Sequence, residues 1–181
     1  MVGSFLVISE KQSKTTTALI SQSVLISMKK IVSLLVPVFI CFLVGWTASY
    51  FQSESLRSWY PLLNKPALTP PNAAFPIAWG IIYLCMGISA GLVFRSGSQN
   101  RATLLALFTV QLFLNFLWSI LFFYFRNPLM GFIDILVLDA GVIIYAIKSY
   151  KANKLASWLF VPYILWLCLA TYLNGYIWLN N

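Results

Sequence analysis

The strongest constraint on this chain is a series of five long apolar stretches that fills it from Ile31 to the end. The stretches cover about residues 31–51, 73–94, 102–125, 129–147 and 155–178. They contain no Lys, Arg or Glu, and their only acidic residues are Asp134 and Asp139. A helix rises about 1.5 Å per residue, so about 20 apolar residues cross the roughly 30 Å hydrocarbon core of a bilayer. Because lipid offers the backbone no hydrogen-bond partner, each stretch is predicted to be a helix.

The amino-acid composition also indicates a chain that lies in lipid. Only 9% of the residues are charged and 60% are hydrophobic, whereas a soluble domain carries about 25% charged residues. Too few residues remain outside the five stretches to build a separate soluble domain. We therefore predict an all-α membrane protein, with one domain over residues 30–181 that is a bundle of five transmembrane helices.

Residues 1–29 form an N-terminal arm of different character, rich in Ser, Thr and Lys. Three interpretations are open: an unstructured arm, a targeting peptide, or a start codon assigned too early. The arm has no Arg and contains Glu10, which is not typical of a transit peptide. Since Met28, Lys29 and Lys30 directly precede the first apolar stretch, we expect Met28 to begin the native protein. Peptides from residues 1–27 in the mature protein would contradict this.

The basic residues are distributed unequally across the predicted bilayer. Nine of the twelve Lys and Arg residues lie in the arm, the second loop and the fourth loop, which share one side of a five-span topology. The other side holds Arg57, Lys65 and Arg126. The positive-inside rule then places the N-terminus inside and the C-terminus outside. This distribution accounts for the net charge of +8 without a nucleic-acid partner, and the compact chain favours a bacterial cytoplasmic membrane.

The chain lacks the sequence pattern of a metal site. It has no histidine, and Cys41, Cys85 and Cys168 lie in three different stretches with no CxxC spacing. The sequence therefore predicts no metal site, no disulfide framework and no required cofactor. We interpret the cysteines as small apolar core residues.

The first loop, residues 52–72, is long, aromatic and rich in proline. It contains Trp59-Tyr60-Pro61, Lys65-Pro66 and Pro70-Pro71. Proline fixes φ and pushes the preceding residue toward an extended conformation, so the loop should be stiff. Two interpretations are open: the loop is a lid over the mouth of the bundle, or Trp59 and Tyr60 are anchors at the level of the lipid headgroups.

Helical spacing gathers aromatic and amide residues into one stripe on each of three stretches. The stripes are Trp79, Tyr83, Met86 and Ala90 in the second stretch; Gln111, Asn115, Trp118 and Phe122 in the third; and Tyr163, Trp166, Ala170 and Asn174 in the fifth. An amide in the bilayer core needs a partner, so the stripes should face inward. They are consistent with a pocket for a flat apolar ligand, and equally with hydrogen bonds between helices and tryptophans that fill space.

Two acidic residues lie inside the fourth stretch. Asp134 and Asp139 are five residues apart, about 140° around a helix, so paired-carboxylate catalysis is not predicted. Asp134 lies near the helix start, where a negative charge is favoured. Asp139 lies deeper and is the better functional candidate, with a structural hydrogen bond or a protonated carboxyl as the alternative.

Several motifs together resemble a known family. They are Trp59-Tyr60, Lys65-Pro66, Pro70-Pro71, Phe75, Trp79, Tyr83 and Met86-Gly87, then Gln111, Asn115 to Ser119 and Phe122-Phe123, and finally Val161 to Trp166 and Ala170 to Asn174. In order and spacing, over about residues 31–181, they resemble the translocator protein family, also called the tryptophan-rich sensory proteins or peripheral benzodiazepine receptors.

The resemblance implies a five-helix bundle, often a homodimer, with a ligand cavity capped by the first loop. A GxxxG motif at Gly87 and Gly91 is compatible with close helix approach within the bundle or between subunits. Family members bind porphyrins such as protoporphyrin IX, haem and benzodiazepine-type ligands, and animal members also bind cholesterol. The implied ligand-binding residues are Tyr60, Pro70, Trp79, Tyr83, Asn115, Trp166 and Ala170, to which the stripe in the third stretch adds Trp118.

The resemblance also implies a function. We expect a membrane receptor or sensor that binds a porphyrin and regulates a tetrapyrrole or stress response. The ligand would pass loop one, stack on Trp79 and Trp166, contact Asn115 and meet Lys65 or Arg57 with its propionates. The alternatives are a transporter, for which no inverted repeat is visible, and a porphyrin-degrading enzyme with Trp79 and Trp166 as electron donors.

Two positions differ from the family pattern, and one of them bears on which ligands the chain can bind. Leu68 stands where the family often has tryptophan between Lys-Pro and Pro-Pro. Tyr176 is followed by no basic residue, whereas cholesterol-binding members have one at the end of the fifth span. Sterol binding is therefore not expected.

Overall fold

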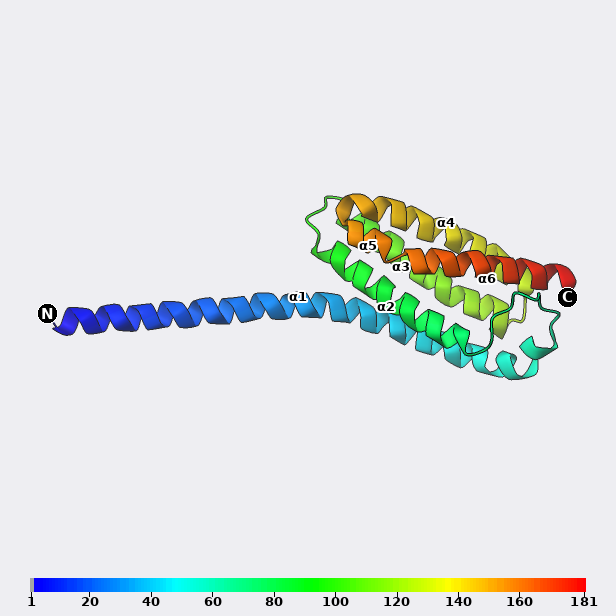
Figure 1. Cartoon of the computed structure of the whole chain (residues 1–181), viewed down its shortest axis with the longest axis horizontal. Coiled ribbons are helices and arrows are strands. Elements are labelled where there is room, and N and C mark those ends of the chain that lie inside the picture. The colour runs from blue at the N-terminus through cyan, green and yellow to red at the C-terminus, as the bar shows by residue number, and fades with distance from the viewer. Residues whose placement is uncertain (1) are drawn as a thin grey trace. The chain divides into compact units, whose positions relative to one another are not determined.

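A computed structural model describes the backbone of residues 2–181 and the side chains of residues 21–181. All regular structure in this part of the chain is helical (Figure 1). The elements are α1 (Val2–Ser58), the short 3-10 helix η1 (Tyr60–Leu62), α2 (Ala74–Arg95), α3 (Arg101–Ser119), the π-helical turn η2 (Ile120–Tyr124), α4 (Pro128–Ala152), α5 (Lys154–Trp158) and α6 (Val161–Asn180). Five of the described helical segments are long and apolar enough to cross a membrane, which confirms the predicted fold class.

The chain divides into two units. The first ends at Ser33 and consists of the N-terminal part of α1, whose backbone is helical from residue 2. The second, Leu34–Asn181, contains the rest of α1 and all other elements. The start of the native chain at Met28 stays a prediction, and the side chains of residues 1–20 lie outside the described part.

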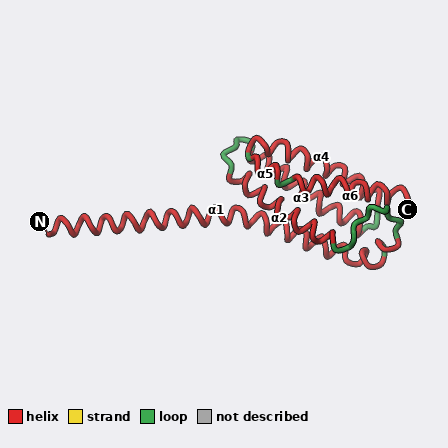
Figure 2. Tube along the Cα trace, viewed as in Figure 1, coloured by secondary structure: helices red, strands yellow, loops and turns green. Residues whose placement is uncertain are grey.

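In the second unit the rest of α1, then α2, α3 and α4 run antiparallel in turn, and α5 and α6 together form the return pass after α4 (Figures 1 and 2). Helix α4 packs against both α3 and α6, and α2 packs against α3 and α6. The core between them contains fully buried side chains from α2, α4 and α6, among them Met86, Val142, Tyr145 and Tyr163. The end of α6 lies beside loop one, where the Asn64 N–H donates to Asn181 Oδ1 at 2.8 Å.

The first helix is longer than the apolar pattern predicted. The expected boundary near residue 51 followed the loss of hydropathy, but α1 continues to Ser58. No proline or glycine interrupts residues 52–58, so nothing in the backbone ends the helix there. Pro61 then falls in η1, and loop one proper covers residues 59–73.

Prolines and caps set other boundaries. Pro128 opens α4, and Asn127 caps it, because Asn127 Oδ1 accepts the Met130 N–H at 3.0 Å. The last predicted stretch is divided into α5 and α6. Pro162, which has no N–H to donate, lies in the first turn of α6 just after the break.

Gly87 of the GxxxG motif meets another helix of the same chain. A Cβ at Gly87 would collide with the backbone of Val38, so glycine allows α1 and α2 to approach closely here. This use of Gly87 does not require a second subunit, and the homodimer stays a prediction.

A candidate ligand cavity inside the bundle

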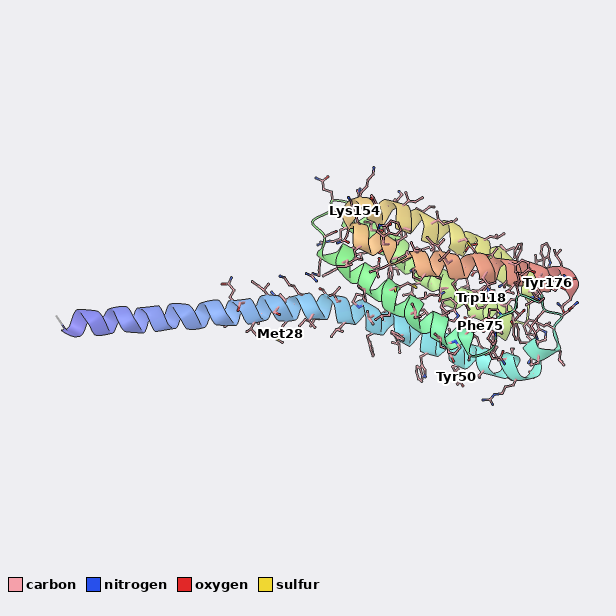
Figure 3. The ribbon with its side chains drawn as sticks, in the orientation of Figure 1. Met28, Tyr50, Phe75, Trp118, Lys154 and Tyr176 are labelled. Carbon is pink, nitrogen blue, oxygen red and sulfur yellow. The ribbon has the colours of Figure 1, made fainter. Side chains whose placement is uncertain are left out.

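A cavity of about 800 Å³ lies inside the second unit. Its walls come from α1, α2, α3, α4 and α6, and loop one covers one end. This volume lies within the range of about 300–1,000 Å³ that is usual for small-molecule sites. Figure 3 labels two of its lining residues, Phe75 on α2 and Trp118 on α3.

One wall of the cavity is a cluster of aromatic rings from α2 and α6. Trp79 stacks on Tyr83, with ring centroids 5.3 Å apart and an angle of 25° between the planes. Trp79 also meets Trp166 edge-on at 6.4 Å, and Trp166 meets Phe75 at 5.5 Å. The helical spacing of Trp79 and Tyr83, four residues apart, puts both rings on the inner face of α2. The wall therefore presents flat, polarisable surface to a guest.

A second aromatic group closes the end under loop one. Trp118 stacks on Phe122, with centroids 5.4 Å apart and planes 15° from parallel. Trp59 and Tyr60 of the loop pack on Phe122 and Phe123 at 5.6 Å each. The π-helical turn η2 holds Phe122 and Phe123, and such turns are frequent at functional sites. These contacts favour the interpretation of loop one as a lid.

The buried amides tie helices together. Asn115 Oδ1 accepts the Tyr83 hydroxyl at 3.0 Å, and Asn115 Nδ2 donates to the Tyr163 hydroxyl oxygen at 2.8 Å. Asn115 thus joins α2, α3 and α6 through one side chain. Trp118 Nε1 donates to Asn174 Oδ1 at 3.1 Å, which forms a second link between α3 and α6. The stripes therefore both line a cavity and form hydrogen bonds between helices.

One charged side chain lines the cavity among the described residues. Lys65 Nζ donates to the carbonyl oxygens of Tyr60 and Pro61 at 2.8 and 3.3 Å, and it lies 4.8 Å from the centre of the Tyr60 ring. An ammonium has three N–H donors, so one remains for a ligand. Burial raises the pKa of the Tyr60 phenol above its ordinary value of 10.0.

The structure brings together nearly all of the residues predicted to bind a ligand. Those that line the cavity are Tyr60, Trp79, Tyr83, Asn115, Trp118, Trp166 and Ala170. Pro70 does not line it, although its neighbour Thr69 does. Arg57, considered for the mouth, is exposed on α1 and does not line it either.

The two acids of α4 lie outside the cavity lining. Asp139 Oδ2 accepts a hydrogen bond from the Thr171 hydroxyl at 2.7 Å, which is the structural alternative considered above. Asp134 is the more buried of the two, and its Oδ2 has no hydrogen-bond partner among the described residues. Gln111 is also fully buried without such a partner, and it does not line the cavity.

Sequence reasoning missed the contribution of α1. Gly45, Ser49 and Gln52 line the cavity, together with Phe42 and Trp46. Gly45, Ser49 and Gln52 recur at i, i+4 and i+7, the spacing of one helical face. Small and polar residues at that spacing in an apolar helix are the signal that would have identified this wall.

The arrangement defines a class of protein: a multi-pass α-helical membrane protein with a cavity between its helices that is lined by aromatic residues. Comparison with known sequences gives the family. The model of the TspO/MBR family matches residues 37–179, and the chain belongs to that family.

Named relatives agree with this assignment. The chain is 42% identical to the tryptophan-rich protein TspO of Archaeoglobus fulgidus over 138 residues, which are 76% of this chain and 90% of the relative. It is 34% identical to the protein of the same name from Chlorobaculum tepidum, over 81% of this chain and 94% of the relative. It is also 34% identical to the human translocator protein, over 73% of this chain and 79% of that protein.

Proposed function

We propose that the protein is a membrane receptor that binds a porphyrin, such as protoporphyrin IX or haem, in the bundle cavity and signals its presence. The observation that carries this proposal is the aromatic wall formed by Trp79, Tyr83 and Trp166. A flat conjugated ring gains most from offset or edge-on contact with such rings. Asn115 uses its amide oxygen and one N–H on Tyr83 and Tyr163, so the wall stays mainly apolar, which suits a macrocycle better than a polar guest.

Lys65 orients the ligand in this proposal. A porphyrin of this kind has an apolar ring and two propionates at one edge, and Lys65 has one unused N–H donor at the lid. One propionate would bind Lys65, and the other would remain near water at the mouth. The ring would then point away from loop one, toward Trp79 and Trp166.

Iron should contribute little to affinity. The chain has no histidine, the residue that most often binds haem iron axially. Ring stacking and the Lys65 contact then account for binding, so metal-free protoporphyrin IX should bind about as well as haem.

Equilibrium titration in lipid nanodiscs tests the proposal. Protoporphyrin IX, haem and protoporphyrin dimethyl ester are each titrated while tryptophan fluorescence is followed. We expect similar affinities for protoporphyrin IX and haem. The Lys65→Gln variant should weaken binding of the free acid by about fivefold, which corresponds to one charge-assisted contact of about 1 kcal/mol, and leave binding of the ester unchanged. Saturable binding of none of these ligands would refute the proposal.

The same preparation separates a receptor from the two alternatives. A porphyrin-degrading enzyme would convert bound protoporphyrin to new products in light, and this conversion would be lost in Trp166→Phe. A transporter would move porphyrin into sealed vesicles. A receptor predicts stable bound ligand, with no conversion in the first assay and no uptake into vesicles in the second.

We also propose an orientation with the N-terminus inside a bacterial cytoplasmic membrane. This rests on the nine basic residues of the arm and the second and fourth loops. Labelling of single cysteines introduced at Ser98 and Asn64, which lie in loops at opposite ends of α2, tests it in intact cells. Only the Asn64 position should react with a membrane-impermeant reagent.

A further inference from the structure

We propose that the ligand enters the cavity sideways from the bilayer, through a slit between α1 and α2, while loop one stays closed, and that this route replaces the passage by loop one expected from the sequence. The inference rests on the proposed function for the identity of the ligand. The route itself follows from how the two helices meet and from which contacts hold each side of the cavity shut.

Helices α1 and α2 touch closely in one half of the bundle and separate in the other. A Cβ at Gly87 would collide with the Val38 backbone, and one at Gly45 would collide with the Tyr83 ring. One to two turns nearer loop one, a Cβ at Gly80 would meet no atom within 4 Å. Gly80 nevertheless lines the cavity. The helices therefore leave an open slit at the level of Gly80.

The residues along this slit face both the cavity and the outside. Trp46 and Ser49 of α1 line the cavity, yet both are exposed, Trp46 by 72%. Pro76, one turn before Gly80 on α2, also lines the cavity and is exposed. Since these residues lie in helices long and apolar enough to cross a membrane, we expect the surface they expose to face lipid. A residue that borders both spaces marks an opening between them.

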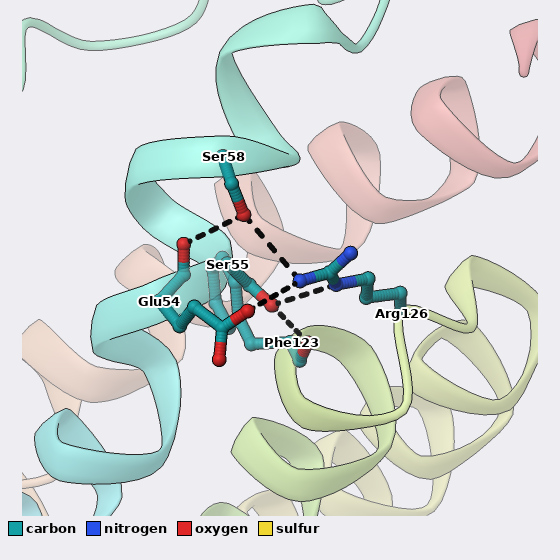
Figure 4. A network of polar contacts seen from close by, with 5 residues as sticks. All are labelled: Glu54, Ser55, Ser58, Phe123 and Arg126. Carbon is teal, nitrogen blue, oxygen red and sulfur yellow. Dashed lines mark hydrogen bonds and ion pairs between the residues drawn. The ribbon is translucent and has the colours of Figure 1, made fainter.

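The opposite side of α1 is fastened by polar contacts. Gln52 Nε2 donates to Ser119 Oγ, and the Ser55 hydroxyl donates to the Phe123 carbonyl, each at 2.6 Å. Arg126 forms an ion pair with Glu54 at 3.1 Å and also donates to Ser55, which joins the turn before α4 to α1 (Figure 4). Within residues 34–181 no hydrogen bond joins α1 to α2. Helix α1 can therefore swing away from α2 about a hinge on its α3 side.

Loop one is fastened as well. The Asn64 N–H and C=O both bond the Asn181 side chain, at 2.8 and 3.2 Å. Lys65 bonds two loop carbonyls, and Trp59 packs on Phe122. Opening the loop breaks these contacts. Widening the slit breaks only apolar contacts, which lipid chains replace, because apolar surfaces gain little by meeting each other inside a bilayer.

The route also suits an amphipathic ring. The slit lies in the half of the bundle toward loop one, so propionates can remain at the headgroup level while the ring moves between α1 and α2. The ring then never crosses water, and the carboxylates never cross hydrocarbon, where a charge costs several kcal/mol.

Reversible cross-linking tests the route. In a background with Cys41, Cys85 and Cys168 replaced by Ala, one variant carries Ser49→Cys and Gly80→Cys across the slit. The matched control carries Asn64→Cys and Asn181→Cys across the lid. Each pair is bridged by a bifunctional maleimide with a disulfide in its linker. Association and release of protoporphyrin IX are measured by stopped flow in nanodiscs, before bridging, after bridging and after reduction.

We expect the slit bridge to slow both association and release by at least about tenfold, with recovery on reduction, because it removes a gating motion. The lid bridge should change either rate by less than about twofold. Rates that respond to the lid bridge and not to the slit bridge would overturn the route. A chain that binds no protoporphyrin IX before bridging would refute the proposed function, and the route with it. Normal binding that is indifferent to the slit bridge refutes the route alone.

Discussion

The hydrogen bonds of Asn115 allow a quantitative test of how the cavity is held together. Asn115 accepts from Tyr83 and donates to Tyr163, at 3.0 and 2.8 Å, and all three side chains are buried. Interhelical hydrogen bonds in membrane proteins contribute about 0.6 kcal/mol on average and about 1.7 kcal/mol at most. Removing both with Asn115→Ala should therefore lower the free energy of unfolding by about 1–3 kcal/mol.

The assay is reversible unfolding in mixed micelles at increasing mole fraction of sodium dodecyl sulfate. A double-mutant cycle with Tyr163→Phe isolates one of the two bonds, and we expect a coupling energy of about 0.6–1.7 kcal/mol. Asn180→Ala is the matched control, because Asn180 is exposed and bonds only the Tyr176 carbonyl of its own helix. A coupling energy below about 0.3 kcal/mol, or an equal loss in Asn180→Ala, would refute the reasoning.

Three further predictions follow from the fold. The Gly87→Ala variant should lose about 1–3 kcal/mol of stability, because the new methyl group pushes Val38 away. The control is Gly97→Ala, whose methyl group meets open space and should change stability by less than about 0.5 kcal/mol. Equal effects of the two substitutions in the same unfolding assay would contradict the close packing of α1 on α2. Asn181→Ala should increase amide hydrogen exchange in loop one several-fold, with the α2–α3 loop as the internal control, and unchanged exchange would show that Asn181 does not hold the lid. Burial raises the pKa of the Tyr60 phenol in the folded state, so the stability that the buried neutral phenol contributes is complete below the ordinary pKa of 10.0 and is lost as the pH rises through the folded-state pKa. The Tyr60→Phe variant should therefore lose less thermal stability than wild type between about pH 9 and 11. Equal losses in the two proteins would contradict a buried phenol.

The sequence predicted the spans well because lipid leaves few choices. An apolar stretch with no charge must satisfy its own backbone, so the helices could be assigned from Ile31 onward. Outside the apolar stretches lipid imposes no such constraint, and the predicted boundaries were less accurate there. The end of α1 was placed near residue 51 by hydropathy, yet the helix continues through polar residues to Ser58, since headgroups and water tolerate a helix equally well.

Some walls of the cavity could be predicted from the sequence and one could not. The inward faces of α2, α3 and α6 could be predicted because aromatic and amide residues recur on them at helical spacing, and Trp79, Asn115 and Trp166 do line the cavity. The α1 wall could not, because Gly45 and Ser49 carry no such obligation. Asp139 remains a functional candidate only as a prediction, and its hydrogen bond from the Thr171 hydroxyl is a contact that residue type alone does not predict.

Porphyrin binding inside the bundle requires that the indole rings of α2 and α6 face one cavity, and one comparison tests this directly. Protoporphyrin IX is titrated against Trp79→Ala/Trp166→Ala and against Trp158→Ala/Trp178→Ala, a pair that is exposed and does not line the cavity. Two aromatic contacts of about 0.5–1.5 kcal/mol each predict a loss of affinity of at least about fivefold for the first pair and none for the second. Equal affinities in the two double variants would contradict binding in the cavity.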